Sequence, residues 1–162
     1  MGHPLDDVMT AFLELLVPAG EDANQVLTAT ATGLEGVRVF DGPPVNAPAE
    51  LEYLVLGLSM DQDASVNGQD VQGWGGRRDV SYGITSLLQV MSGDTTVATV
   101  RRRLLQLLDA FGALLRADES LGGACTRAWL SEWRYQAVES AKGATALIEF
   151  TVGVDAVRFE GE

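Results

Sequence analysis

The segment VSYGITSLLQVMSGDTTVATVRRRLLQLLDAF, residues 80–111, changes its hydrophobic period at the group SGDTT. Before this group, apolar side chains occupy alternate positions, which is typical of a strand with one buried face. After it, apolar side chains recur on one side of a helix, for which Asp94 or Thr95 is the expected N-cap. The alternating set is Val80, Tyr82, Ile84, Leu88 and Val90, and the helical set is Val97, Val100, Leu104, Leu107, Leu108, Phe111 and Leu115. The segment therefore predicts a strand followed by a helix.

Three consecutive arginines stand in the predicted helix. On a helical wheel Arg102 points away from the apolar stripe, while Arg101 and Arg103 flank the stripe on either side. We interpret the three as a solvated helix face, on which the stems of the flanking arginines cover apolar neighbours. The main alternative is a contact with another subunit.

Helix and strand signals continue on both sides of this segment. Asp6 or Asp7 can cap a first helix that runs to Leu16, because Pro18 and Gly20 follow it. Further strands are predicted in VRVFDGPPV (37–45), LEYLVLGL (51–58), residues 127–138 and ATALIEFTVGVDAVRF (144–159), with a short one at 26–31. This order predicts one α+β domain over residues 1–162, with a mostly antiparallel sheet of four to five strands and two helices packed on one face.

The stretch Met60–Gly76 is rich in glycine, acids and amides, and it predicts a long loop or extended hairpin at about 60–78. Trp74 in this stretch is followed by Arg77 and Arg78. Tryptophan and arginine carry a large share of binding energy at protein interfaces, so these residues are candidate interface anchors. The alternative is that Trp74 folds back over its own domain.

Charge and composition exclude several classes of protein. The formal net charge is -12, and residues 1–70 hold 12 acidic residues against the single base Arg38. Such a surface repels phosphate, which argues against binding of free nucleic acid. One cysteine, Cys125, and one histidine, His3, leave no internal disulfide and no histidine-rich metal site. No apolar run approaches the roughly 20 residues that span a bilayer, and no signal peptide is evident, so a cytoplasmic protein is expected.

Reactive motifs are absent from the sequence. There is no GxxxxGK[ST] phosphate loop and no GxSxG nucleophile elbow, and His3 is badly placed to activate a serine or Cys125. The acids Asp61, Asp63 and Asp70 do not follow the calcium-loop pattern. We therefore expect no catalytic residue, no cofactor and no metal, and we expect that the protein is not an enzyme.

The order of these pieces resembles the tail terminator (tail completion) proteins of long-tailed bacteriophages and gene transfer agents. The resemblance runs from Val37 to Phe159 and rests on VRVFDGPP, LEYLVLGL, a strand closing in SGD, the helix RRRLLQLLDAFGALLRADESLGG and a final strand. It implies a structural virion protein that forms a hexameric ring on the head-proximal end of the tail tube and stops tube growth there. The implied partners are further copies, the tail tube protein and the head–tail connector, and genomic DNA passes through without specific binding. The implied location is the virion tail, after assembly in the host cytoplasm and without a membrane.

Two hypotheses about residues accompany the resemblance. A closed ring needs two different surfaces that meet head to tail, and basic groups on one copy can face acids on the next. The candidate subunit or tail-tube contacts are Trp74, Arg77, Arg78, Arg101, Arg102 and Arg103. An acidic lumen would keep DNA from adhering, and the candidate lumen residues are Glu35, Asp41, Glu50 and Glu52.

Two other functions fit the same sequence. A head–tail connector or other neck subunit shares the size and the ring architecture. A small ligand-binding α+β domain could use Trp129, Trp133 and Tyr135, which are predicted to lie on one side of a strand, either as a groove or as core or sheet face.

Overall fold

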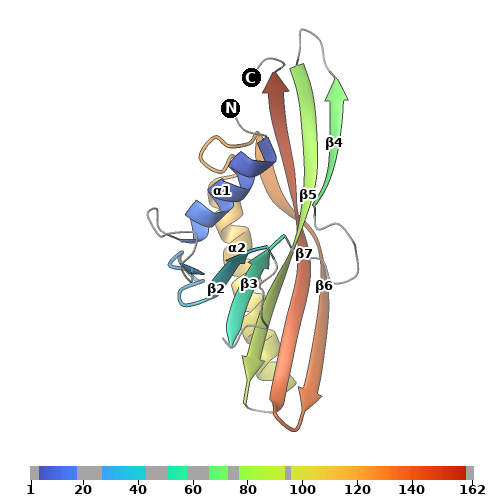
Figure 1. Cartoon of the computed structure of the whole chain (residues 1–162). Coiled ribbons are helices and arrows are strands. Elements are labelled where there is room, and N and C mark those ends of the chain that lie inside the picture. The colour runs from blue at the N-terminus through green and yellow to red at the C-terminus, as the bar shows by residue number, and fades with distance from the viewer. Residues whose placement is uncertain are drawn as a thin grey trace.

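The computed structural model of the chain describes residues 4–17, 27–42, 51–57, 66–72, 77–93 and 96–159. Its helices are α1 (Pro4–Leu16) and α2 (Val97–Ala117). Its strands are β1 (Leu27–Thr28), β2 (Arg38–Asp41), β3 (Glu52–Leu56), β4 (Val66–Gln72), β5 (Arg77–Ser92), β6 (Arg127–Ser140) and β7 (Gly143–Phe159). The predicted α+β class is confirmed, with both helices on one face of the sheet (Figure 1).

The strands form one sheet in the order β1-β2-β3-β5-β7-β6, and β4 pairs with β5 beside β3. Only the β2–β3 pair is parallel among the described strands, so the sheet is mostly antiparallel as predicted. The described residues contain more strands than the expected four to five. They include β1, which is only 2 residues long, and β4, which forms inside the glycine-rich stretch. There β4 and the start of β5 make an antiparallel hairpin.

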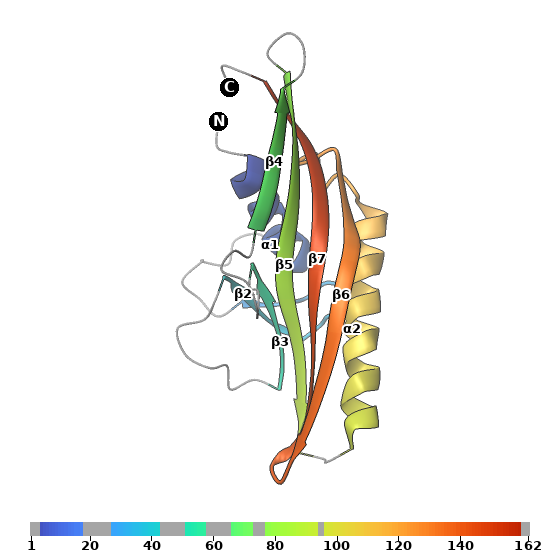
Figure 2. The same ribbon diagram turned by 90° about the vertical axis from the view of Figure 1, so that its right-hand side faces the viewer.

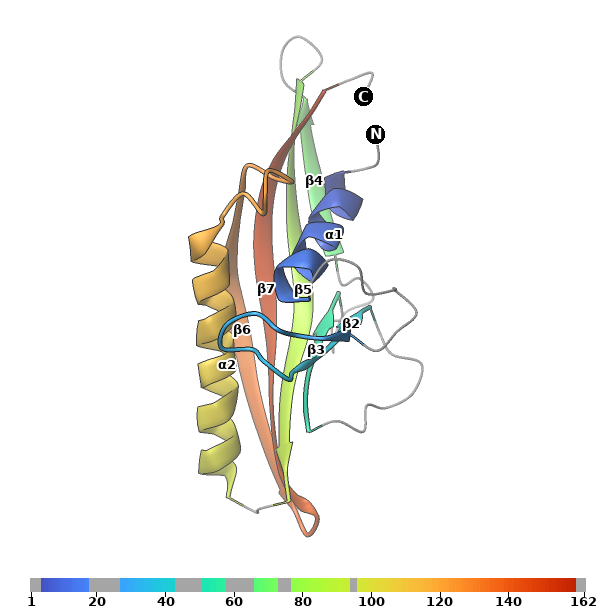
Figure 3. The ribbon, with the colours of Figure 1, turned by 90° about the vertical axis from the view of Figure 1, so that its left-hand side faces the viewer.

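Three long strands dominate the shape of the molecule. β5, β7 and β6 contain 16, 17 and 14 residues, and at ~3.3 Å per residue β5 alone extends roughly 50 Å. Together they form a twisted ribbon that continues past α1 at one end (Figure 2), and α2 runs along one of its faces (Figure 3). Much of the other face of this ribbon therefore lies outside the helix-covered core.

The main core lies between the helices and this face of the ribbon. Alternate residues of β7 are buried there, and the predicted stripe of α2 is buried with the exception of half-buried Val97. Phe111 connects the layers, since its ring centroid lies 6.4 Å from that of Phe12 in α1 and 5.1 Å from that of Phe150 in β7. These contacts connect the short α1 to the sheet through α2.

The start of α2 differs from the prediction. Thr96 occupies the N-cap position with an extended backbone, and its side chain makes no capping hydrogen bond. Asp94 and Thr95, the predicted caps, lie outside the described residues. The helix is held instead by the burial of its apolar stripe, which contributes more than a cap does.

Strand β6 contains a register shift that corrects a second prediction. Between Leu130 and Glu132 one extra residue is inserted, so Trp129 pairs with Gly153 whereas Trp133 pairs with Phe150. Because neighbouring residues of a strand point to opposite faces, this bulge places Trp129 on the open face and Trp133 on the helix face. The three aromatic residues Trp129, Trp133 and Tyr135 therefore do not share one side of the strand.

Candidate functional site

The candidate interface arginines lie at opposite ends of the ribbon. Arg77 and Arg78 begin β5, where Arg78 pairs with Arg158 of β7. Arg101 to Arg103 lie in the first turns of α2, which starts beyond the other end of β5. The two clusters thus belong to separate surfaces, roughly a full strand length apart. Trp74 lies outside the described residues.

Within the second cluster the three arginines behave differently. Arg101 and Arg102 are exposed, as a solvated helix face requires. Arg103 turns toward the sheet and donates two hydrogen bonds to the Glu52 carboxylate of β3, at 2.7 and 3.0 Å. These hydrogen bonds raise the pKa of Arg103 against the effect of burial, and the charges of Glu52 and Glu35 raise it further. Arg103 therefore ties α2 to β3 within one chain.

The candidate lumen acids differ in their surroundings. Glu35 and Asp41 are exposed, Glu52 is occupied by Arg103, and Glu50 lies outside the described residues. Glu35 belongs to a turn between β1 and β2 that packs on α2 (Figure 3). The packing is close, because a Cβ on Gly33 would lie 2.7 Å from the Cβ of Ala110.

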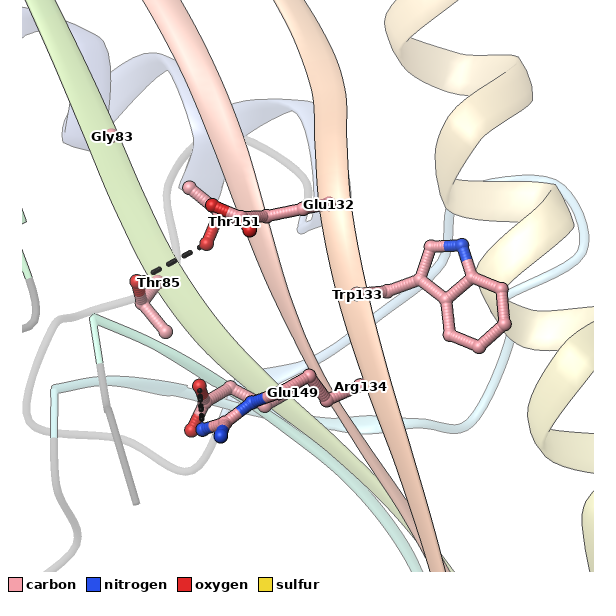
Figure 4. Close-up of a pocket in the computed structure, with 7 residues that line it drawn as sticks. All are labelled: Gly83, Thr85, Glu132, Trp133, Arg134, Glu149 and Thr151. Carbon is pink, nitrogen blue, oxygen red and sulfur yellow. Dashed lines mark hydrogen bonds and ion pairs between the residues drawn. The ribbon is translucent and has the colours of Figure 1, made fainter. Parts of the chain in front are cut away.

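The open face of the ribbon carries a row of polar side-chain pairs. The Ser81 hydroxyl donates to Asp155 at 2.8 Å, the hydroxyls of Thr85 and Thr151 lie 3.3 Å apart, and Arg134 donates to Glu149 at 2.8 Å. A cavity of about 410 Å³ lies among the last two pairs, with Gly83 and Glu132 also at its wall (Figure 4). The side chain of Glu149 is only 8% exposed, so this carboxylate depends on neighbouring groups for its charge compensation.

Arg134→Ala is expected to lower the free energy of unfolding by about 1–3 kcal/mol, because the buried Glu149 carboxylate loses its guanidinium donor. Urea denaturation at neutral pH measures this change. Arg102→Ala is the matched control, since Arg102 is exposed and its removal is expected to cost less than about 0.5 kcal/mol. Equal effects of the two substitutions would contradict the assigned role of the pair.

Trp129 closes one side of this polar face. Its indole lies over Gly153, where an added Cβ would come within 2.6 Å of the ring, and the Arg127 guanidinium lies 5.2 Å from the ring centroid. Trp129 thus packs on its own sheet, with a cation–π contact on it. A ligand groove built from Trp129, Trp133 and Tyr135 together is not formed.

Among the described side chains of the sheet, the most exposed large apolar ones lie on the edge strand β6 and are Trp133, Val138 and Tyr135. Trp133 is 56% exposed and Tyr135 is 36% exposed, and both belong to the helix face of β6. Figure 4 shows Trp133 projecting toward α2, on the side away from Arg134 and Glu149. Leu105 of α2 is exposed as well, at 38%. The sequence pattern offers a groove, core or sheet face for Trp133 and Tyr135, and it places them on the same side as Trp129 because it gives no signal for the bulge.

Cys125 follows α2 and is buried. Its thiol donates to the backbone carbonyl of Glu119 at 3.6 Å. Burial, with a smaller contribution from the charge of Asp118, raises the pKa of this thiol from 9.0 to about 11. The thiol therefore stays protonated at physiological pH, and a protonated thiol is a poor nucleophile.

Alkylation of native Cys125 by iodoacetamide at pH 8 is expected to be at least ~100-fold slower than in the urea-unfolded chain, because the thiolate fraction falls tenfold per unit of pKa. Mass spectrometry of the modified protein measures both rates. Similar alkylation rates in the native and unfolded chain would contradict the burial of this thiol.

The stabilising contribution of the protonated thiol is complete below pH 9 and is lost as the pH rises toward about 11.

Within the described ranges, no group of three or more His, Cys, Asp or Glu side chains could hold a metal ion. Neither described helix combines the length and apolar character needed to cross a bilayer.

No family model matches the chain, and no curated protein matches it. A solved structure does. It is described as "Virion of native gene transfer agent (GTA) particle", and one of its chains is similar to this chain at 14% identity and a TM-score of 0.42. The match covers 74% of this chain and 78% of that chain.

Proposed function

We propose that the protein is a structural virion component, without enzymatic activity, that forms a hexameric ring at the head-proximal end of a phage-type tail tube. There it ends tube polymerisation and offers the surface to which the head joins. The observation that carries the proposal is the exposed aromatic pair Trp133 and Tyr135 on the edge strand β6, because exposed aromatic residues beside a sheet edge that no described strand covers favour protein–protein contact. The sequence resemblance over Val37–Phe159 supports assigning that contact to the tail of a phage-type particle.

The net negative charge of the chain supports a role in which the protein surrounds DNA without binding to it. Exposed Glu35 and Asp41, together with Glu50, are the candidate acids of the lumen, whereas the charge of Glu52 is compensated by Arg103. A wall of carboxylates repels phosphate and leaves DNA free to move. Finding these acids on the outer surface of an assembled ring would count against this part of the proposal.

Negative-stain microscopy of tail tubes assembled with and without the protein tests the proposal. Sixfold rings on one tube end, and tubes of limited length, are the expected result. Trp133→Glu is expected to abolish capping, whereas Gln106→Glu, an exposed change on α2, is the matched control and should leave it intact. Tubes that grow equally long and uncapped with the wild-type protein would refute the proposal.

The arginine clusters are the proposed electrostatic contacts of the ring or of the tube. Because they lie at opposite ends of the ribbon, they meet different partners or different parts of one neighbour. Arg101→Glu with Arg102→Glu changes only exposed side chains and leaves the Arg103–Glu52 pair in place. We expect this double variant to weaken ring or cap formation most at low ionic strength, and unchanged light scattering would remove this cluster from the contact.

A head–tail connector or other neck subunit is the alternative within the same class. Pull-down with isolated tail tubes and with isolated heads distinguishes the two, since a terminator is retained by tubes that have never met a head.

A further inference from the structure

The ribbon has two long edges that no described strand covers. Among the described strands, β6 pairs only with β7 and β4 pairs only with β5. The four strands β4, β5, β7 and β6 lie side by side and alternate in direction throughout. A sheet of this kind can be extended at either edge by a strand of suitable direction.

Neither described edge strand contains proline or lysine, two residues that usually prevent such pairing. Beyond its bulge, β6 continues regularly from Glu132 to Ser140 without proline or lysine, and β4 contains neither residue. Residues 131–136 form a continuously exposed run of β6, and Gly68, Gln69 and Asp70 of β4 are exposed too. A long unprotected edge with exposed aromatic side chains favours aggregation unless a partner covers it.

We propose that the partner is a second copy of this chain, and that β4 of one copy pairs antiparallel with β6 of the next. The inference rests on the proposed ring and names its subunit contact. Strand direction supports it: a rotation about an axis along the ribbon keeps each strand's direction, so β6 of the neighbour runs opposite to β4. The contact joins two different edges and therefore closes head to tail, as a ring requires.

The tilt of strands in a closed sheet fixes the register within narrow limits. Gln69 is level with Ser81, Asp155 and Arg127 across the sheet. Strands in closed sheets tilt by about 35–45°, which across four spacings of ~4.8 Å shifts the register by roughly four to six residues. Without a tilt, Gln69 of one copy would lie opposite Arg127 of the next. A shift toward the C-terminal end of β6 brings Glu132 or Arg134 opposite Gln69 instead. A shift in the other direction would pass beyond Arg127, the first residue of β6.

Pairing of Gln69 with Arg134 keeps the contact clear of the bulge. It places residues 66–71 of β4 opposite residues 132–137 of β6, with helix-face residues opposite helix-face residues on both strands. Tyr135 then lies opposite Gly68, and Trp133 lies opposite Asp70. An aromatic residue opposite a glycine already occurs inside the chain, where Trp129 covers Gly153. At Gly68 the ring of its own partner Tyr82 already lies close, 3.0 Å from the position of an added Cβ, so the neighbour's Tyr135 would pack beside the Tyr82 ring.

Engineered disulfides test the pairing and its register. Asp70→Cys with Trp133→Cys joins one predicted pair, and Val66→Cys with Ala137→Cys joins another while keeping both exposed aromatic residues. Directly opposite residues bring Cα atoms to ~4.5–5.5 Å, within disulfide range, whereas inside one chain these positions are at least three strand spacings, about 14 Å, apart. Native Cys125 can stay in place because its thiol is buried.

Oxidation of tube-bound protein, followed by non-reducing electrophoresis, is expected to give a ladder of covalent oligomers for both pairs. Gln69→Cys with Trp133→Cys is the control, because its two side chains would point to opposite faces; we expect at least ~10-fold less cross-linking from it. Rings on tube ends without cross-links above this control would overturn the pairing and leave the proposed function intact. Cross-linked oligomers that fail to cap tubes would support the pairing and refute the function. Cross-links from Trp133→Cys to the tube protein alone, or no oligomer with or without tubes, would overturn the pairing.

Discussion

Gly143→Ala is expected to lower the free energy of unfolding by about 3–5 kcal/mol, the sum of a strained backbone and a steric clash. Gly143 follows the turn between β6 and β7 and has a φ of 128°, a conformation that side chains disfavour. An added Cβ would overlap the backbone carbonyl oxygen of Ser92, and a backbone atom of β5 cannot move aside as a side-chain tip can. Urea denaturation followed by circular dichroism measures the loss.

Gly36→Ala separates the two causes. Gly36 has a φ of 83°, but no atom lies within 4 Å of the position of its added Cβ. This control therefore measures backbone strain alone and is expected to cost about 1–2 kcal/mol. If both alanine variants were equally stable, the close approach of the β6–β7 turn to β5 would be wrong.

Phe111→Ala is expected to destabilise the protein by about 3–5 kcal/mol, because it leaves a cavity where α1, α2 and β7 meet. Phe111 is 1% exposed and contacts aromatic rings on both sides. Thermal unfolding and urea denaturation both measure the effect. Leu105→Ala on the same helix is the control, since Leu105 is 38% exposed and its truncation removes little buried area. A loss below about 1 kcal/mol for Phe111→Ala would show that the two helices do not share this core.

Local patterns predict the elements of this fold well wherever burial follows a single period. Val80 to Val90 alternate and form β5, and the stripe from Val100 to Leu115 is buried in α2. In both cases one face of a regular element meets one core, so spacing along the chain is enough. β4 was predicted only as one of two possibilities, because VNGQDVQ contains few strand-forming residues and is held mainly by its pairing with β5.

The candidate surfaces depend on relations that the sequence does not display. One inserted residue in β6 moves Trp129 to the face opposite Trp133, and no local signal near Ser131 indicates that insertion. Arg103 was predicted to flank the apolar stripe, but its partner Glu52 is 51 residues away in the chain. The distance between the two arginine clusters likewise follows from the length of β5 and from where α2 begins.

The place of β7 in the sheet has a consequence for how the protein acquires its structure. β7 is the last described strand along the chain, yet it lies between β5 and β6. Its first and last partners in β5, Ser92 and Arg77, are separated from it by the whole of α2 and β6. The β4–β5 and β6–β7 hairpins can form locally, but the β5–β7 ladder that joins them must wait for a large loop to close. We expect slow folding in which the two hairpins form first and the β5–β7 ladder joins them in one late, cooperative event.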